Sequence, residues 1–314
     1  MKTAAAVALV CLVSLGAARS ALGEESGEKL AFMPGGGPRE FRFDTGVLRG
    51  VIPFDKQSLG LLPAVHVPTD TPLAASMGLF NYYRVFKTSH RFVESMRQIP
   101  SDVRLLPDGT LEVHWPSAEE RPFELTAVYR WTAPNTLDLE STVKATEELP
   151  DFEVFLAAYF TEHLPISHIY VHQTPDGPEN AFMAADESFG VWQAYPRDDA
   201  ATAIIKDGRW TKPPSPVDWA IMPRIAAPLL YRQATDKRVT VAIMAPKEDA
   251  FAVFTPCEGE KHYSMYLGLF GRTFAAGETA TAHSRLVVMS DASDETIIDE
   301  YRAYRDDVQK EEKP

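Results

Sequence analysis

Cysteine is scarce in this chain, which has two among 314 residues, at positions 11 and 257. Cys11 lies in an N-terminal segment that we expect to be removed, so the mature chain would keep only Cys257 and could form no intrachain disulfide. The sequence also lacks the Gly-x-Gly-x-x-Gly phosphate loop and the Gly-x-Ser-x-Gly motif of an activated serine. We therefore predict no cofactor and no serine-hydrolase chemistry.

Basic residues are also fewer than acidic ones. Lysine and arginine total 31 residues against 44 aspartate and glutamate residues, and the net charge is −13. Nucleic acids and anionic membrane surfaces attract basic proteins, so this balance excludes both as partners. It also disfavours a strongly anionic polysaccharide.

Long apolar runs are absent apart from residues 4–18, which follow Lys2 and carry no charge. Ala21 and Gly23 place small residues immediately before Glu24. A positive residue, an apolar run and small residues in that order are typical of a secretory signal peptide. We predict cleavage near Gly23, a periplasmic or secreted protein, and no membrane span after cleavage; an uncleaved anchor is the alternative.

The rest of the chain is dominated by short alternating runs. In residues 123–145 apolar and polar side chains alternate on either side of a Pro-Asn turn, and residues 107–109 form a Pro-Asp-Gly turn between two similar runs. Period-two alternation with such turns predicts antiparallel strands. Residues 149–173 are more apolar, as expected of a strand that is covered on both faces. The predicted class is all-β, a large antiparallel β-sandwich.

One helix is predicted, at the C-terminus. Ser293 can serve as its N-cap, and the spacing of four apolar side chains gives it a single buried stripe. These side chains are Ile297, Tyr301, Tyr304 and Val308. Since no linker divides the remaining chain, we predict a signal peptide at 1–23, a flexible leader at 24–40 and a single domain at 41–314.

Residues 81–84, Asn-Tyr-Tyr-Arg, combine hydrogen-bonding groups with rings that can stack on a sugar. Alternation along an expected strand puts Tyr82 and Arg84 on one face and Asn81 and Tyr83 on the other. Trp192 and Trp210 lie in or beside expected loops, where they could form part of a carbohydrate platform. Ordinary packing is the alternative for each of these residues.

Four histidines bear on catalysis or metal binding. His163 follows Glu162 near the end of an expected strand, and His262 lies in the charged loop 257–263 together with Glu258. Both histidines are candidate acid/base groups. A pair four residues apart, at 168 and 172, would be separated by roughly 13 Å along a strand, too far to bind one ion. We predict no metal site.

Several of these stretches together resemble the galactose-mutarotase-like supersandwich superfamily, which includes aldose epimerases and domains of polysaccharide lyases. Tyr159 and Phe160 match a Tyr-Phe pair of that family, and Arg84 lies in a suitable early segment. Glu258 stands at the position of the family's catalytic glutamate, and residues 276–278 match the turn before its last strand. The resemblance implies a supersandwich fold and a carbohydrate ligand.

The chain departs from this family at one catalytic position. Ala157 stands where the family has its histidine, the general acid toward the ring oxygen. Opening a hemiacetal requires one group that gives a proton and another that takes one. The resemblance then implies that Glu258 acts together with His163 or His262, while Arg84 and Tyr83 position the substrate.

Three interpretations of the function follow. The first is an exported carbohydrate-active enzyme of the epimerase or lyase type. The second is an exported protein that binds carbohydrate without altering it, and the third is a structural or interaction protein of the cell envelope. The sequence leaves the sugar, the reaction and the oligomeric state open.

Overall fold

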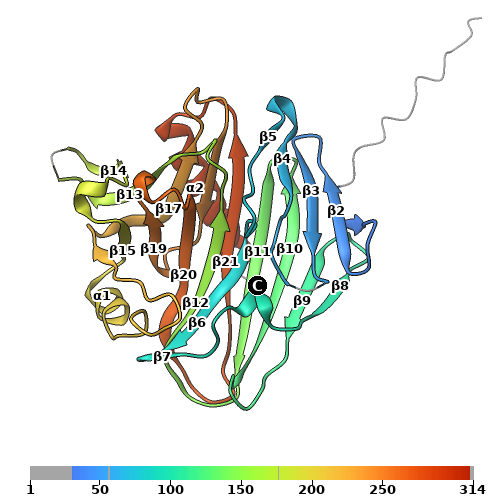
Figure 1. The fold of residues 1–314 in the computed structure, drawn as a ribbon, viewed down its shortest axis with the longest axis vertical. Coiled ribbons are helices and arrows are strands. Elements are labelled where there is room, and N and C mark those ends of the chain that lie inside the picture. Colours follow the sequence, from blue (N-terminus) through green and yellow to red (C-terminus); the bar gives the residue numbers. More distant parts are fainter. Residues whose placement is uncertain (1–29, 56, 176, 312–314) are drawn as a thin grey trace, which may run out of the picture.

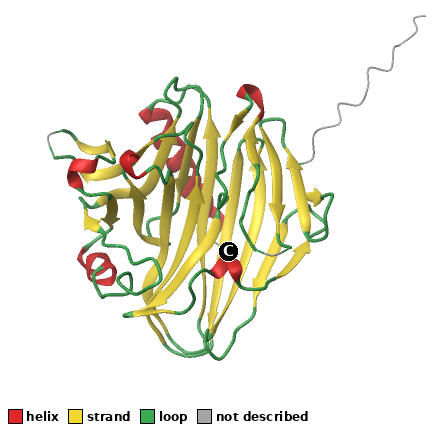
Figure 2. Ribbon diagram, in the orientation of Figure 1, coloured by secondary structure: helices red, strands yellow, loops and turns green. Residues whose placement is uncertain are grey.

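The computed structural model describes residues 30–55, 57–175 and 177–311, so the predicted signal peptide lies outside the described residues. Strands make up most of the fold, and helices are few (Figure 2). The strands form three sheets that share one hydrophobic core. These features confirm the predicted class, a large antiparallel β-sandwich with a C-terminal helix.

The largest sheet has nine strands in the order β14-β13-β17-β18-β21-β11-β10-β9-β8. Their bounds are β8 (Asp102–Leu105), β9 (Leu111–Trp115), β10 (Phe123–Ala133), β11 (Thr136–Ala145), β13 (Ile166–Gln173), β14 (Glu179–Ala184), β17 (Ile225–Gln233), β18 (Thr240–Met244) and β21 (Thr279–Met289). The predicted turn at 107–109 joins β8 to β9, and Gly109 has a φ of +89°, which its lack of a Cβ allows.

The second sheet has seven strands in the order β16-β15-β19-β20-β12-β6-β7. Their bounds are β6 (Asn81–Lys87), β7 (His90–Arg91), β12 (Leu149–Tyr159), β15 (Trp192–Pro196), β16 (Ala220–Ile221), β19 (Ala250–Pro256) and β20 (Ser264–Phe274). Its strands pair antiparallel except β15 and β16.

The third sheet lies at the right of Figure 1 and has five strands in sequence order. They are β1 (Met33–Pro34), β2 (Glu40–Asp44), β3 (Leu48–Pro53), β4 (Ala64–His66) and β5 (Thr71–Pro72).

The described part of the predicted flexible leader is folded, so that prediction was wrong there. Phe32 is 2 % exposed, and its ring lies 6.0 Å from that of Phe43 and 5.8 Å from that of Trp131. The glycine-rich run is a turn between β1 and β2, closed by a hydrogen bond from Gly35 N to Glu40 O of 2.8 Å. The folded domain therefore begins before residue 41.

Helices cover the outer faces of the two large sheets. The two α-helices are α1 (Asp199–Ile205) and α2 (Asp294–Glu311). Short 3-10 turns are η1 (Val67–Thr69), η2 (Met96–Gln98), η3 (Glu187–Phe189) and η4 (Glu258–Glu260).

Helix α2 confirms the sequence prediction. The hydroxyl of Ser293 accepts a hydrogen bond from Thr296 N at 3.2 Å, as an N-cap does. All four predicted stripe residues are buried, and they pack on the outward side chains of β17, β18 and β21. The stripe thus seals the outer face of the nine-stranded sheet.

Strand β12 is buried on both faces, as its apolar sequence predicted. Leu156 and Ala158 point into the core between the sheets, while Phe155, Ala157 and Tyr159 belong to a second apolar cluster on the outer face. Alternation along a strand produces this division. Helix α1 and residues 206–219, here called the cover loop, complete the second cluster; α1 lies at the lower left of Figure 1.

Candidate functional site

A cavity of about 240 Å³ opens where the cover loop meets the outer face of the seven-stranded sheet. Its walls come from β6, β12, β15 and β20, from the cover loop and from the loop after β19. The lining residues are Met77, Tyr83, Arg84, Arg97, Phe155, Tyr159, Trp192, Trp210, Ser215, Pro216, Val217, Trp219, Glu260, His262 and Tyr266. A concave, mostly aromatic site with a few polar groups is the usual form of a small-molecule site.

A β-bulge brings Tyr83 and Arg84 to the same cavity. In the ladder between β6 and β12, Arg84 pairs with Phe155 and Tyr82 pairs with Leu156, so Tyr83 is an extra residue on β6. A bulge of this kind re-aims the side chains beside it. The sequence prediction that Tyr83 and Arg84 occupy opposite faces was therefore wrong, because it assumed unbroken alternation.

The Arg84 side chain is 1 % exposed and serves as both wall and anchor. Its Nη2 donates to the carbonyl oxygen of Ser215 at 2.7 Å and to the hydroxyl of Tyr83 at 3.0 Å. The guanidinium carbon lies 5.1 Å from the ring centroid of Trp210. Arg84 thus ties the cover loop to β6.

Arg97, from η2, is the second cationic wall residue and is 9 % exposed. Its guanidinium carbon lies 4.8 Å from the ring centroid of Tyr83 and 5.3 Å from that of Tyr159. Nη1 donates to Oδ1 of Asn81 at 3.4 Å. Stacking on two rings holds the charge beside the cavity.

Three tryptophans form a continuous aromatic wall. The ring centroids of Trp192 and Trp219 are 5.8 Å apart, and those of Trp210 and Trp219 are 5.3 Å apart, both edge to face. The indole N–H groups of Trp210 and Trp219 are buried without an acceptor among the described residues. The wall therefore combines apolar rings with two indole N–H groups that have no acceptor among the described residues.

His262 is the titratable group of the cavity whose charge state is clearest. Burial is the main cause that lowers its pKa; Glu260 opposes this lowering, and Arg232 and Arg97 add smaller contributions to it. Its ring centroid lies 5.4 Å from that of Tyr159 and 5.5 Å from that of Trp192. The imidazole is therefore neutral at neutral pH and can accept a proton.

The backbone around His262 is strained. Lys261 has a φ of +55° and Tyr263 a φ of +40°, in the left-handed region that non-glycine residues seldom adopt. Such strain persists where the surrounding structure enforces it and is concentrated at functional sites. The carbonyl oxygen of Tyr263 accepts a hydrogen bond from Phe160 N at 2.8 Å, which helps to hold this backbone in place.

A buried acid-base cluster fastens the near end of the cover loop. Arg209, which is fully buried, donates to Glu153 Oε2 at 3.0 Å and to both carboxylate oxygens of Asp207. Two carboxylates thus share one guanidinium. Burial, with a smaller contribution from Asp207, raises the pKa of Glu153 to about 7 against the lowering by Arg209.

Comparisons with known proteins address the fold. No protein-family model matches the sequence, and no curated protein matches it. A galactose mutarotase related enzyme from Lactobacillus acidophilus is a structural match, with a TM-score of 0.50 and 9 % identity over 81 % of this chain and 99 % of that one. An alpha-N-acetylgalactosaminidase from Bifidobacterium bifidum matches with a TM-score of 0.53 and 10 % identity, over 85 % of this chain and 39 % of that one.

The chain has a galactose-mutarotase-like fold. On this fold Ala157, which the resemblance aligned with the family's histidine, is fully buried in the outer cluster between Phe155 and Tyr159. Its methyl group can neither give nor take a proton. His262, Glu260 and the tyrosines are the proton-transfer groups that the described residues bring to this cavity.

Five of the sequence-predicted site residues line the cavity together: Tyr83, Arg84, Trp192, Trp210 and His262. Asn81 is fully buried behind the wall, where its amide nitrogen donates to Met77 O at 2.9 Å and its oxygen accepts from Arg97. It supports Arg97 and does not line the cavity.

His163 does not line the cavity. His163 lines a separate groove of about 400 Å³ with Glu162 and Asp236, because the chain turns away after Phe160 at the end of β12. Glu258 begins η4, but its side chain lies outside the described part of the structure.

Sequence reasoning missed Arg97 and Tyr266 as lining residues. Arg97 comes from a single 3-10 turn with no alternating pattern around it. Tyr266 could have been found, since β20 alternates and Tyr266 pairs with Ala157 on the outer face.

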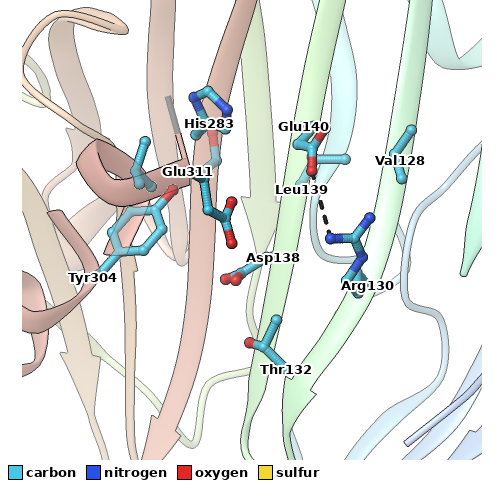
Figure 3. Close-up of a pocket in the computed structure, with 11 residues that line it drawn as sticks. Val128, Arg130, Thr132, Asp138, Leu139, Glu140, His283, Tyr304 and Glu311 are labelled. Carbon is cyan, nitrogen blue, oxygen red and sulfur yellow. Dashed lines mark ion pairs between the residues drawn. The ribbon is translucent and has the colours of Figure 1, made fainter. Parts of the chain in front are cut away.

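Figure 3 shows a second hollow, beneath α2, which measures about 40 Å³. Its charged groups are engaged with one another: Arg130 pairs with Glu140 at 4.0 Å, and Asp138 accepts from Arg285 at 2.7 Å. The space is about that of one water molecule, whose share of liquid volume is ~30 Å³. It is too small for a sugar ring.

Two features are absent from the described residues. These residues contain no group of three histidine, cysteine, aspartate or glutamate side chains that could hold a metal ion. None of their helices is long and apolar enough to cross a membrane.

Glu153→Gln should change how stability depends on pH. The unfolded carboxyl titrates near 4.5 and the folded one near 7, so the folded protein binds this proton more tightly. As the pH rises through that window, the wild type should lose on the order of 3 kcal/mol of unfolding free energy that the variant keeps. Urea unfolding from about pH 5 to about pH 8 measures the loss. A half-buried surface control, Glu124→Gln, should follow the wild type; equal pH dependence in wild type and Glu153→Gln would contradict the assignment.

Proposed function

We propose that this protein is an exported carbohydrate-binding protein and that the aromatic cavity is its ligand site. The observation that carries the proposal is the tryptophan wall, which combines flat apolar faces with unpartnered N–H donors in one concave site. Sugars present C–H faces that pack on aromatic rings and oxygens that accept hydrogen bonds.

The size and the fold support this proposal. A volume of about 240 Å³ equals that of about eight waters, enough for one sugar ring with its substituents. The structural matches are named as a galactose mutarotase related enzyme and an alpha-N-acetylgalactosaminidase, and carbohydrate-active proteins thus share this architecture. Fold alone does not fix function, so the lining residues carry the argument.

Trp192→Ala should weaken sugar binding. Trp192 is half-buried at the cavity mouth, and loss of its ring face should raise the dissociation constant roughly tenfold without unfolding the protein. Intrinsic tryptophan fluorescence, titrated with galactose, glucose, N-acetylgalactosamine and their oligosaccharides, gives the affinities. The matched control is Phe189→Ala, an exposed ring outside the cavity, which should bind as the wild type does. No binding of any sugar would favour the third interpretation, a cell-envelope interaction protein.

A second candidate function is acid/base catalysis on the bound sugar, as in an epimerase or a lyase. The neutral His262 favours it, because a general base must be unprotonated at working pH and within reach of the substrate. The adjacent Tyr159 can supply a proton, since burial raises its pKa and keeps the phenol protonated.

His262→Gln should abolish turnover if the protein is an enzyme. The amide keeps a polar side chain of similar reach but cannot take a proton, so the rate should fall about 10²-fold or more while binding persists. Nuclear magnetic resonance of anomer exchange and mass spectrometry of oligosaccharide products measure the rate. Wild-type activity should rise with pH through the lowered pKa of His262. A wild type that alters no sugar would leave the binding function alone.

Export rests on residues 1–23, whose order of charge, apolar run and small residues is that of a signal peptide. Expression of the full chain in a bacterium with a periplasm should yield periplasmic protein that starts at Glu24. Fractionation and N-terminal sequencing test this. Cytoplasmic protein that retains Met1, or membrane-bound protein with an intact N-terminus, would contradict export by cleavage.

A further inference from the structure

Arg84 has more hydrogen-bond donors than the described residues satisfy. Its Nη2 is engaged by Tyr83 and Ser215, but Nε and Nη1 are buried and have no acceptor among the described residues. Leaving a buried donor unpaired costs about 1–3 kcal/mol, and more for a charged group. Since Arg84 lines the cavity, this guanidinium has capacity for a ligand that brings acceptors.

The cavity walls also carry more positive than negative charge. Neither Arg84 nor Arg97 forms an ion pair among the described residues. Arg209, equally buried beside the same loop, shows the opposite arrangement, with Glu153 and Asp207 both bonded to it. The charge of Arg84 does act on Glu153, but the carboxylate of Glu153 is bonded to Arg209.

Negatively charged groups are few among the other lining side chains. Glu260 supplies the cavity's one lining carboxylate within the described residues, and its side chain is exposed at the rim. The hydroxyl of Tyr83 already accepts from Arg84. The cavity wall therefore carries two guanidinium groups and little negative charge to match them.

We propose that the cavity binds a sugar that carries an anionic substituent, a carboxylate or a phosphate, held by Arg84 and Arg97. This inference rests on the proposed carbohydrate-binding function and narrows its ligand. A guanidinium matches both carboxylate and phosphate oxygens with paired, charge-assisted hydrogen bonds. The tryptophan wall contacts the ring, and the anionic group lies toward β6 and η2.

The whole-chain charge is consistent with a small ligand of this kind. A net charge of −13 repels a long polyanion over the surface. A single anionic group inside the cavity interacts chiefly with the two nearby arginines, because surface charges beyond about 10 Å are screened at physiological ionic strength. The proposal thus concerns one charged sugar unit and not an extended acidic polymer.

The test compares sugars that differ in charge alone. Isothermal titration calorimetry would measure binding of galactose, galacturonate and galactose 6-phosphate, and of glucose and glucuronate. An anionic member should bind at least about tenfold more tightly than its neutral counterpart. The tighter of carboxylate and phosphate identifies the substituent. Equal affinity of neutral and anionic sugars would overturn the inference and leave the proposed function standing, whereas no binding of any sugar would overturn both.

Arginine variants locate the contact. Arg84→Gln and Arg97→Gln should each remove the preference for the anionic sugar and leave affinity for the neutral one less changed. Arg91→Gln is the matched control, because Arg91 donates to Pro213 and Pro214 carbonyls of the cover loop but does not line the cavity. If Arg84→Gln fails to fold, Arg97→Gln carries the test. Variants that keep the preference, or an Arg91→Gln that also loses it, would overturn the assignment.

Discussion

The structure depends on one constraint, the burial of strand β12 on both faces. Its side chains alternate between the core that joins the sheets and the outer cluster beneath the cover loop. A strand covered on one face needs apolar residues at every second position, whereas β12 needs them at nearly all. The residues that seal the outer face therefore had to come from elsewhere in the chain, and α1 with the cover loop supplies them. The cavity is the part of that outer face that the cover loop leaves open.

Hydrogen bonds from arginine side chains hold the cover loop in position. Arg209 fastens the near end to Glu153, and Arg84 with Arg91 fastens residues 213–215. A guanidinium suits this task because its donors form a rigid planar fork that bonds several carbonyls at once. Arg209 and Arg84 differ in how many of their donors are paired. Arg209 donates to two carboxylates, whereas Arg84 donates to neutral oxygens and has two buried nitrogen atoms without an acceptor among the described residues. An anchor that is incompletely satisfied at a cavity wall is also a binding group.

Sequence periodicity predicted the parts of the fold that are regular. The C-terminal helix followed from its N-cap and stripe, the hairpin at 107–109 from its turn residues, and the two-sided burial of β12 from its composition. Irregular features could not be read in this way. The bulge at Tyr83 is an extra residue in one strand relative to its partner, and a single sequence does not show its partner. Arg97 could not be predicted either, because it reaches the cavity from a 3-10 turn that no alternating pattern marks. The glycine-rich run before β2 was predicted to be flexible because turns and flexible leaders share a composition.

Net charge illustrates the difference between a property of the chain and a property of a site. The excess of 44 acidic over 31 basic residues describes the solvent-exposed surface, where salt screens it. Inside the cavity the effective dielectric is lower and two arginines lie within contact of the same tyrosine ring, so the local field there is positive. The lowered pKa of His262 comes mainly from burial, with Glu260 opposing it and Arg232 and Arg97 adding to it. The electrostatics that a ligand meets are thus set by the bulge, the 3-10 turn and the cover loop, which bring these few groups together, and not by the composition of the chain.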